Sequence, residues 1–349
     1  MKDGSETHFE REIREQPAVL ARLLGDERVR AVAGALRERA PHLIATLARG
    51  SSDNAVTFFG YLAGQTLGLP VASLPPSLLN VYAARMRAEG TVAIGVSQSG
   101  ESSDVVGGLT ALRRAGATTV AVSNDPGSSL VDAADHALLQ GAGLEQAVAA
   151  SKTFTSQMLL LSLLVAHWGK DAALLAALEA VPAAMTALLD GPQDGLEEVA
   201  LRLTPARSCY VLGRGLSYAP ALESALKLKE TCYLHAEAYS SAEFQHGPIA
   251  AVNPSDPVLM LALADATAAP NQDAATKLRA ASADLSVIGA DEALRREGNA
   301  VVTLPAGLHP VTQAFVQVLA GQLLALHLAT AKGLDPDAPR HLNKVTKTM

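Results

Sequence analysis

The chain contains the stretch His42-Leu-Ile-Ala-Thr-Leu-Ala48, an apolar run that passes directly into Arg49-Gly50-Ser51-Ser52 and then into a helical pattern. The same order recurs 165 residues later, where Ser208-Cys-Tyr-Val-Leu212 is followed by Gly213-Arg214-Gly215-Leu216-Ser217 and by another helical pattern. A short strand, a glycine-containing turn and a helix form one supersecondary unit, and its repetition indicates an internal duplication. The sequence therefore predicts two tandem copies of the same fold.

Both copies continue with the same kinds of elements in the same order. The expected later strands are Thr91–Val96 and Thr118–Val122 in the first copy, and Pro257–Leu263 and Asp284–Ile288 in the second. A long apolar helix closes each copy, at about residues 154–168 and 311–331. Short apolar strands that alternate with helices are typical of a parallel sheet covered on both faces. We therefore expect an α/β protein of two tandem parallel-sheet domains, each with three α/β/α layers and related by a pseudo-two-fold axis.

The domain boundaries follow from the breaks between these apolar patterns. Residues 10–24 have the pattern of a helix, and Pro182 and Gly191-Pro192 interrupt the segment that joins the two copies. The expected segments are an N-terminal helical segment (1–30), a first domain (31–170), a helical linker (171–200), a second domain (201–335) and a C-terminal tail that closes the site (336–349).

The composition excludes several classes of protein. The formal net charge is −7, and no stretch concentrates lysine or arginine enough to attract a nucleic-acid backbone. The two cysteines rule out a disulfide framework and a Cys-rich zinc site. The N-terminal stretch Met1–Gln16 is densely charged, so we expect no signal peptide and a cytoplasmic location.

One segment, Val311–Ala331, has the length and low charge of a membrane-spanning helix. Within it, however, Gln313, Gln317, Gln322 and His327 recur at helical spacing, and such polar side chains are costly in lipid. We therefore expect a buried helix of an α/β protein at this position, and no membrane partner.

The loop after the strand Thr91–Val96 has the composition of an anion-binding site. It contains Ser97-Gln98-Ser99-Gly100-Glu101-Ser102-Ser103-Asp104 and leads directly into an expected helix. Backbone N–H groups and the positive end of the helix dipole favour an anion at such a junction. A helix cap needs one hydroxyl group, whereas this loop has four, and Ser51 and Ser52 lie in the loop of a neighbouring strand. The sequence therefore predicts a phosphate site here.

The second copy differs at the corresponding places. Its matching loop, Ala264–Pro270, lacks the serine cluster, so only the first copy is expected to bind the anion. The turn Gly213-Arg214-Gly215 does not complete a dinucleotide-binding fingerprint, because Tyr218 stands where a third glycine would be required.

The second copy carries titratable residues instead. Glu223, Lys227 and Glu230 are spaced so that they share one face of a helix, where they could also form a solvated ion-pair stripe of little energetic value. The segment Tyr233–Pro248 then combines two histidines and two glutamates with little helical or strand periodicity, and an irregular segment of this kind is more typical of a functional site. No metal site is expected, because the segment has no His-x-x-x-His motif or cysteine pair.

Six blocks of this sequence resemble the double sugar-isomerase (SIS) domain family. They are most similar to the isomerase half of glutamine–fructose-6-phosphate amidotransferase, and the similarity extends over nearly the whole chain, starting at Glu12–Pro17. The six blocks are Ser97–Glu101, Ala149–Lys152, Ala225–Glu230, His235–Ala238, His246–Pro248 and Pro339–Lys344. The resemblance implies two flavodoxin-like SIS domains and an enzyme that acts on a sugar phosphate without a cofactor.

The resemblance also implies which residues bind the substrate. The phosphate of a hexose 6-phosphate would be held by the serine loop, and sugar hydroxyls would meet the side chain of Glu145 and the backbone near Val148. The implied phosphate-binding residues are Ser97, Gln98, Ser99 and Ser102, with Ser51 or Ser52 nearby.

Three residues would carry the chemistry by the same resemblance. Glu230 would move a proton between C1 and C2, His246 would open and close the sugar ring, and Lys344 would form a Schiff base with the ketose carbonyl. His246 would reach the site from the neighbouring subunit, so the resemblance implies a homodimer. The residues expected to support these groups are Glu223, Lys227 and His235.

The sequence departs from the synthase in two respects. Lys2 stands where the synthase has the cysteine nucleophile of its glutaminase domain, and the two cysteines of this chain, Cys209 and Cys232, lie elsewhere. The ending Val345–Met349 and the segment Ala238–Phe244 resemble the stand-alone type II glucosamine-6-phosphate deaminases. We therefore expect conversion of glucosamine 6-phosphate and water to fructose 6-phosphate and ammonia.

Other functions use the same residues and stay open. One is a synthase-type isomerase and aminotransferase that acts on fructose 6-phosphate without its glutaminase domain, and another is a related sugar-phosphate isomerase or deglycase. A non-catalytic sugar-phosphate sensor is less well supported, because the chain has no basic N-terminal module and retains Glu230, His246 and Lys344. In each case the expected ligand is a hexose or hexosamine 6-phosphate.

Overall fold

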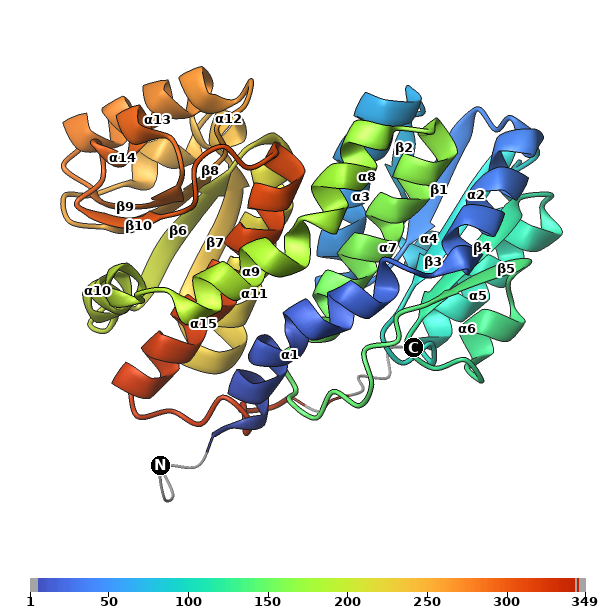
Figure 1. Ribbon diagram of the computed structural model, residues 1–349, viewed down its shortest axis with the longest axis horizontal. Helices are drawn as coiled ribbons and strands as arrows, with labels where there is room; N and C mark the ends of the chain where they lie inside the picture. The colour runs from blue at the N-terminus through green and yellow to red at the C-terminus, as the bar shows by residue number, and fades with distance from the viewer. Residues whose placement is uncertain (1–5, 343, 345–349) are drawn as a thin grey trace. The chain divides into compact units, whose positions relative to one another are not determined.

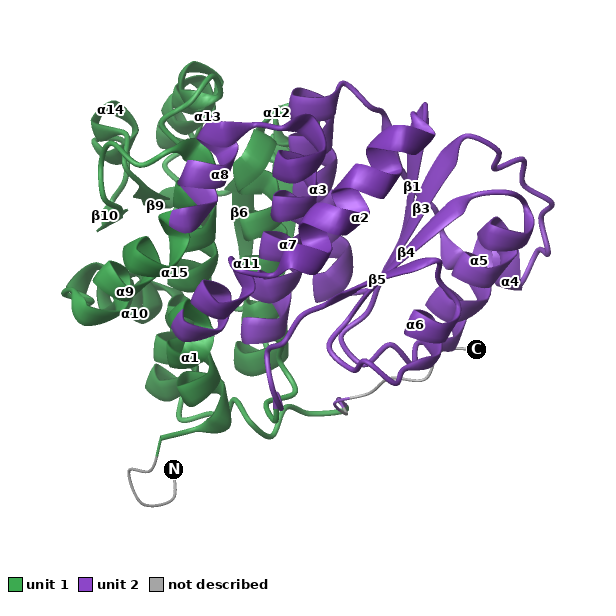
Figure 2. Cartoon of the chain, turned by 45° about the vertical axis from the view of Figure 1, so that its right-hand side comes forward, with its two compact units in different colours: residues 1–17, 146–151, 180–341 green, residues 18–145, 152–179, 342–349 purple. Residues whose placement is uncertain are grey.

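The computed structural model describes residues 6–342 and 344, which form two compact units. Unit 1 comprises the chain up to Pro17, the segment Gln146–Ser151 and the long segment Ala180–His341. Unit 2 comprises Ala18–Glu145, Lys152–Glu179 and the chain from Leu342 onward (Figure 2). Each unit is therefore assembled from segments that are far apart in the sequence. Position 343 and residues 345–349 of the expected tail lie outside the described residues.

Unit 2 is built around a parallel sheet of five strands in the order β2-β1-β3-β4-β5 (Figure 1). The strands are β1 (Leu43–Leu47), β2 (Val71–Ser73), β3 (Thr91–Val96), β4 (Thr118–Ser123) and β5 (His136–Leu139). Strand β3 is buried along its whole length, as expected for a central strand with helices on both faces. Leu47 of β1 is in register with Gly95 of β3, so the carboxyl ends of these two strands lie at the same edge of the sheet.

Helices form a layer on each face of this sheet (Figure 2). On one face α3 and α2 pack against α7, and α8 packs on α7 as well. On the other face α5 lies between α4 and α6 and shares an apolar core with β1, β3 and β4. The bounds are α2 (Glu27–Arg39), α3 (Ser51–Leu67), α4 (Pro76–Asn80), α5 (Ser103–Arg114), α6 (Ser129–Asp132), α7 (Lys152–Gly169) and α8 (Ala172–Glu179).

Unit 1 contains a second five-stranded parallel sheet, with the order β10-β9-β8-β6-β7. Its strands are β6 (Ser208–Gly213), β7 (His235–Ser240), β8 (Pro257–Ala262), β9 (Asp284–Gly289) and β10 (Ala300–Thr303). On one face α15 packs against α9, α10 and α11, and on the other lie α12, α13 and α14. Helix α1 (His8–Leu23) belongs to unit 1 as far as Pro17. The remaining bounds are α9 (Val181–Asp190), α10 (Asp194–Leu203), η1 (Gly215–Ser217), α11 (Tyr218–Cys232), α12 (Ser241–Phe244), η2 (Pro248–Ala251), α13 (Ala268–Ala280), α14 (Glu292–Arg295) and α15 (Pro310–Ala331).

The two sheets have the same topology. Numbered in chain order within its own unit, each reads 2-1-3-4-5, because β7-β6-β8-β9-β10 repeats β2-β1-β3-β4-β5. This is the doubly wound, flavodoxin-like order. The prediction of two tandem α/β domains with parallel sheets and three layers is confirmed.

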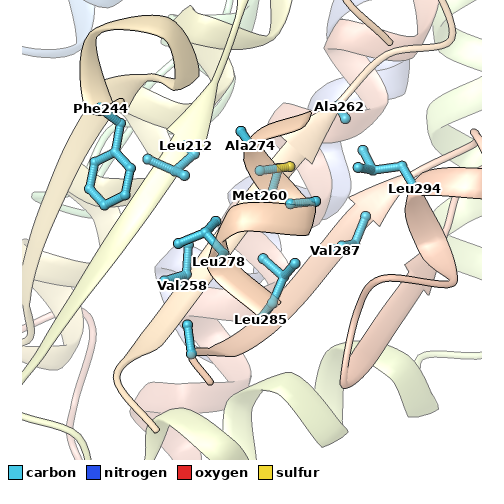
Figure 3. Close-up of a cluster of buried hydrophobic side chains, with 12 residues drawn as sticks. Leu212, Phe244, Val258, Met260, Ala262, Ala274, Leu278, Leu285, Val287 and Leu294 are labelled. Atoms are coloured by element: carbon cyan, nitrogen blue, oxygen red, sulfur yellow. The ribbon is translucent and has the colours of Figure 1, made fainter. Parts of the chain in front are cut away.

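The core between the sheet of unit 1 and helices α12, α13 and α14 is filled by aliphatic side chains and one phenylalanine (Figure 3). The Phe244 ring is fully buried and lies 5.0 Å from the Tyr210 ring and 5.6 Å from the Tyr239 ring, measured between centroids. These edge-type contacts fasten the short helix α12 against β6 and β7. The chain just after Ser240 is therefore held by packing.

Helix α15 is a core helix of unit 1. Pro310–Ala331 is long and apolar enough to cross a membrane by composition, but 83% of its most apolar window is buried within the protein. Its polar side chains have partners there, because Ser217 Oγ donates to Gln317 Oε1 at 2.8 Å and Gln16 Nε2 donates to Gln322 Oε1 at 2.7 Å. The prediction of a buried helix at this position is confirmed. A second stretch, Ala172–Asp190, meets the same test of composition but is divided into α8 and α9.

One expectation about the second copy was wrong. The segment Tyr233–Pro248, interpreted from the sequence as irregular, contains strand β7, helix α12 and the start of the 3₁₀ turn η2. Strand β7 is an edge strand that pairs in parallel with β6, from His235 opposite Ser208 to Ser240 opposite Gly213. Most of its residues are polar or partly exposed, because only β6 borders it, and the apolar alternation that usually marks a strand is weak.

Candidate active site

The strand order of unit 2 creates a place for a ligand between β1 and β3. The chain runs from β1 to α3 on one face of the sheet and from β3 to α5 on the other, so the two connecting loops diverge at the carboxyl edge. In open parallel sheets such a switch point forms the crevice in which ligands bind. The two loops are residues 48–50, which lead into Ser51, and the serine loop, residues 97–102.

Hydrogen bonds within the serine loop fix its shape. The hydroxyl oxygens of Ser97 and Ser102 are 3.2 Å apart, and the Gly100 N–H donates to Ser97 Oγ at 3.1 Å. Ser97 is buried, whereas Gln98, Ser99 and Ser102 are only partly buried. The loop therefore presents amide and hydroxyl groups at the protein surface from a fixed backbone.

Hydrogen bonds from neighbouring segments hold the serine loop in place. Gln140 Nε2 donates to the Ser97 carbonyl at 3.2 Å, and the Leu130 N–H donates to the Gly100 carbonyl at 3.0 Å. The carboxylate of Glu101 accepts from both the N–H and the hydroxyl of Ser129, at 2.8 and 2.9 Å. This acidic side chain is thereby committed to the start of α6.

Gly100 is required by the geometry of the loop. Its φ of +67° lies in the left-handed region that glycine adopts at little cost. A Cβ at this position would lie 2.1 Å from Ser128 Oγ and 2.6 Å from Ser123 Oγ, closer than any real contact. The close approach of the loop to β4 and α6 therefore depends on the missing side chain.

The serines of this loop do more than cap a helix. Ser102 occupies the N-cap position of α5, yet its side chain makes no capping hydrogen bond and lies beside Ser97 Oγ instead. The simple cap interpretation is therefore wrong for Ser102. The positive end of the α5 dipole and the serine hydroxyls lie at one place, which is an arrangement suited to an anion.

The neighbouring loop brings two further serines and an ion pair that the sequence analysis missed. Ser51 is the first residue of α3 and is partly buried, and Ser52 is buried. Arg49 Nε donates to Asp104 Oδ2 at 2.8 Å, which connects this loop to the first turn of α5. The available signal was the position of both residues, because Arg49 directly precedes Gly50-Ser51 and Asp104 lies two residues after the end of the serine loop.

Lys344 and Glu145 form an ion pair within unit 2. Lys344 Nζ lies 2.7 Å from Glu145 Oε2, although the two residues are 199 positions apart in the sequence. The Glu145 side chain is fully buried, and its carboxylate also accepts from the N–H of Thr153 at 3.1 Å and from the Thr153 hydroxyl at 2.8 Å. Glu145 is thus held at the start of α7, and it fixes the position of the predicted Schiff-base amine.

Val148 lies in the short segment that belongs to unit 1. It is partly buried, and the buried carboxylate of Glu12 in α1 holds the backbone just before it. The N–H groups of Gln146 and Ala147 donate to Glu12 at 2.5 and 3.2 Å. Glu12 was noted only as part of the first matching block, and its partners show why a carboxylate stands there.

In unit 1, α11 carries a buried ionic cluster. Lys227 Nζ lies 3.3 Å from Glu223 Oε1 and 2.5 Å from Glu230 Oε2. The Lys227 and Glu223 side chains are almost fully buried, and Glu230 is 21% exposed. A solvated stripe is therefore excluded. Glu230 is the member of the cluster that a ligand can reach.

The charges of this cluster depend on one another. Burial alone would lower the pKa of the Lys227 ammonium, but the carboxylates of Glu223 and Glu230 outweigh this effect and raise the pKa above its ordinary value. Lys227 therefore stays protonated and provides the positive charge beside the Glu230 carboxylate. A carboxylate held in this way can act as a base that accepts a proton from carbon.

The two histidines lie at the two ends of a segment that contains β7 and α12. His235 is exposed and begins the strand, five residues after Glu230, whereas His246 is exposed and follows the strand and α12. His246 Nδ1 is 2.9 Å from the Ala242 carbonyl, a contact that orients the ring.

The described start of the tail packs beside the end of α11. The Arg340 guanidinium lies over the Tyr233 ring, 4.4 Å from its centroid, and the Arg340 N–H donates to the Tyr233 hydroxyl at 3.1 Å. Tyr233 is the left-handed residue that ends α11, three positions after Glu230. These contacts anchor the tail of unit 1 near the Glu230 cluster.

A duplicated 2-1-3-4-5 sheet, with a serine loop at the switch point of one copy and an ionic cluster on a helix of the other, defines the class of this protein. The SIS domain model matches residues 39–167 and 202–332. The chain belongs to the SIS domain family, and it contains two such domains.

Within this family the chain is similar to aminotransferases that act on fructose 6-phosphate. It is 34% identical over 348 residues to glutamine–fructose-6-phosphate aminotransferase (isomerizing) from Methanothermobacter thermautotrophicus, an alignment that covers 98% of this chain and 58% of that relative. The chain thus spans less than two thirds of the length of this curated relative. The predicted resemblance to its isomerase half is confirmed.

Two solved structures are similar over nearly their full length. The C-terminal domain of glucosamine-fructose-6-phosphate aminotransferase from Francisella tularensis is 28% identical, with a TM-score of 0.87 and coverage of 97% of this chain and 100% of that one. A protein from Silicibacter pomeroyi, provisionally assigned as a phosphosugar isomerase, is 38% identical, with a TM-score of 0.85 and coverage of 95% and 100%.

Proposed function

We propose that this chain is a sugar-phosphate isomerase that interconverts fructose 6-phosphate plus ammonia and glucosamine 6-phosphate plus water. The observation that carries the proposal is the serine loop, which places hydroxyl groups and an uncapped helix N-terminus together at the switch point of unit 2. Its relatives are named for a reaction of fructose 6-phosphate, which supports this substrate class.

In this proposal Ser97, Ser99 and Ser102 donate hydrogen bonds to the phosphate, with Gln98 and either Ser51 or Ser52. Hydrogen bonds to a charged group contribute about 1.5–3 kcal/mol each, so four or five suffice to hold a phosphate dianion. The loop meets this requirement with a backbone that is already fixed before the ligand arrives, which lowers the entropic cost of binding.

Lys344 supplies the amine in the proposed mechanism. Its nitrogen attacks the ketose carbonyl at C2 to form an imine and water. Ammonia then adds to C2 and displaces the lysine amine, and the resulting ketimine acts as the electron sink for removal of a proton from C1. Glu145, 2.7 Å from Lys344 Nζ, is placed to accept the proton that the ammonium must lose before it attacks. Contact between Glu145 and sugar hydroxyls, as the resemblance implied, stays a prediction.

Glu230 transfers the proton between C1 and C2, and His246 of a second subunit opens the sugar ring. The sharing between subunits rests on the family resemblance, which implies that His246 reaches the site from the neighbouring subunit. Glu223 and Lys227 hold the Glu230 carboxylate, and His235 is the nearest histidine along the chain. The homodimer is part of this proposal.

The deaminase interpretation is the second candidate. An enzyme lowers the barrier in both directions, so the same residues serve the release of ammonia from glucosamine 6-phosphate and its incorporation into fructose 6-phosphate. The names of the relatives favour the aminotransferase direction. The similarity of Ala238–Phe244 to the type II deaminases favours the other.

Turnover assays of the whole chain test the proposal. We expect ammonia and fructose 6-phosphate to form from glucosamine 6-phosphate, and hexosamine phosphate to form from fructose 6-phosphate with ammonium. The initial rates of the two reactions, compared with each other, identify the faster direction. Lys344→Ala should abolish turnover in both directions but leave the binding of fructose 6-phosphate measurable by calorimetry, because phosphate binding does not use the amine. Lys229→Ala, which removes an exposed lysine of α11, is the control and should leave turnover unchanged.

Two results would count against the proposal. Normal turnover of the Lys344→Ala variant would exclude imine formation at Lys344, and absence of hexose-phosphate binding by the wild-type chain would exclude the substrate class.

A further inference from the structure

The ion pair between Arg49 and Asp104 stands beside the serine loop and has no role in the chemistry proposed above. Arg49 directly precedes Gly50, the N-cap residue of α3, and Asp104 lies two positions after Ser102 in the first turn of α5. The Arg49 side chain is 52% exposed, whereas that of Asp104 is only 7% exposed. The guanidinium therefore covers a buried carboxylate at the edge of the crevice between β1 and β3.

Asp104 is tied into the structure by further bonds. Its Oδ1 accepts from the Val105 N–H at 2.9 Å, and its main-chain carbonyl accepts from Asn80 Nδ2 at 2.6 Å. The carboxylate is thus held in the first turn of α5, next to the place where a phosphate would bind. Its charge repels a dianion there unless another group cancels it.

A second carboxylate, that of Asp53, feels the charge of Arg49. Asp53 in the first turn of α3 accepts from Ser73 Oγ at 3.3 Å. Burial raises the pKa of Asp53 above its ordinary value, while the hydrogen bond from Ser73 and the positive charge of Arg49 act in the opposite direction. Arg49 therefore acts electrostatically on carboxylates of both α3 and α5.

We propose that Arg49 neutralises Asp104 so that the uncharged donors of the serine loop can bind a phosphate dianion. This inference rests on the proposed function, because it takes phosphate as the ligand of the loop. Arg49 acts through Asp104 and is a positioning residue for the anion site. Its contribution is the positive charge, and the ion pair places that charge at the boundary between the two loops.

Binding of inorganic phosphate and of fructose 6-phosphate to the whole chain, measured by calorimetry, tests this role. We expect Arg49→Gln to weaken the binding of both ligands by about tenfold or more, which corresponds to at least about 1.4 kcal/mol. Arg49→Lys keeps the charge and should stay within roughly threefold of the wild type, although it loses the planar fork of the guanidinium. Arg49→Gln/Asp104→Asn removes the uncancelled carboxylate as well and should recover most of the lost affinity.

Recovery in the double variant separates a charge effect from a structural one. If Arg49 only supported the loop, the double variant would bind as weakly as Arg49→Gln or more weakly, and the inference would be overturned. Arg113→Gln is the matched control, because Arg113 pairs with Asp135 at 2.8 Å with similar exposure of the arginine but lies in the last turn of the same helix. Its phosphate affinity should equal that of the wild type.

The outcome for the wild-type chain distinguishes the two levels of the proposal. If wild type binds both ligands and Arg49→Gln binds them equally well, the role of Arg49 is excluded while the proposed function stands. If wild type binds neither ligand, the proposed function fails and the role of Arg49 fails with it.

Discussion

Replacement of Glu230 by glutamine is expected to slow the exchange of a C1 proton of fructose 6-phosphate with deuterated water by about 10²–10⁴-fold, which is the usual contribution of a general acid–base group. The amide is nearly the same size as the carboxylate but cannot accept the proton. The carboxylate of Glu230 is 2.5 Å from Lys227 Nζ and partly exposed, so a ligand can reach it.

This exchange can be followed by proton NMR with fructose 6-phosphate, even where no net product forms. Glu237→Gln is the control, because Glu237 is an exposed glutamate of the adjacent strand β7. The control should exchange at the wild-type rate. Exchange at an undiminished rate in the Glu230→Gln variant would mean that another group is the base.

Replacement of Lys227 by methionine is expected to lower the free energy of unfolding by about 3–5 kcal/mol, the cost of removing one partner from a buried ion pair. Methionine fills a similar volume, so packing changes little. The Glu223 carboxylate, however, is 1% exposed and would be left without its ammonium partner. The loss is electrostatic in origin, because the buried Glu223 carboxylate would lose the ammonium that offsets the cost of its burial.

Urea unfolding monitored by circular dichroism measures this loss. Lys227→Met/Glu223→Gln removes the buried Glu223 carboxylate together with the lysine. This double variant should regain most of the stability, since a neutral buried pair is tolerated far better than a single buried ion. Lys229→Met, at an exposed position of the same helix, should change stability by less than about 0.5 kcal/mol. A double variant as unstable as Lys227→Met would show that packing, and not charge, accounts for the loss.

The central strands of both sheets could be predicted closely from the sequence. Thr91–Val96 was predicted with the bounds that the structure gives, and Thr118–Val122 ends one residue early. These strands are buried on both faces, so that almost every residue is apolar or β-branched and the run is unmistakable. The repeat of the strand, turn and helix in both halves also predicted the duplication of the domain.

The edge strands could not be predicted in this way. Strands β2 and β7 border only one other strand, and β2 has three residues, none of them fully buried. In β7 the sequence His-Ala-Glu-Ala-Tyr-Ser offers little apolar signal, since one side of the strand is open. A periodic pattern of apolar residues arises where one face of an element is buried. Edge strands are buried only in part, so their sequences show this pattern weakly.

The sequence predicted the parts of the candidate site that lie in one continuous segment. It did not predict the parts in which the fold brings distant residues together. The serine loop is one continuous segment at a strand-to-helix junction, and its chemistry could be inferred directly. The pairs Arg49–Asp104 and Lys344–Glu145 join residues 55 and 199 positions apart, which no spacing rule relates. The burial of Lys227 could not be predicted either. Glutamate and lysine at the same helical spacing can form an exposed stripe or a buried cluster, and the sequence does not distinguish the two.

The central claim is that the serine loop of unit 2 binds the phosphate of the substrate. A crystal structure of the whole chain with fructose 6-phosphate tests it most directly. We predict phosphate oxygens within about 3.2 Å of the hydroxyl and N–H groups of residues 97–102. A phosphate bound elsewhere, with the serine loop unoccupied at saturating ligand, would contradict the account.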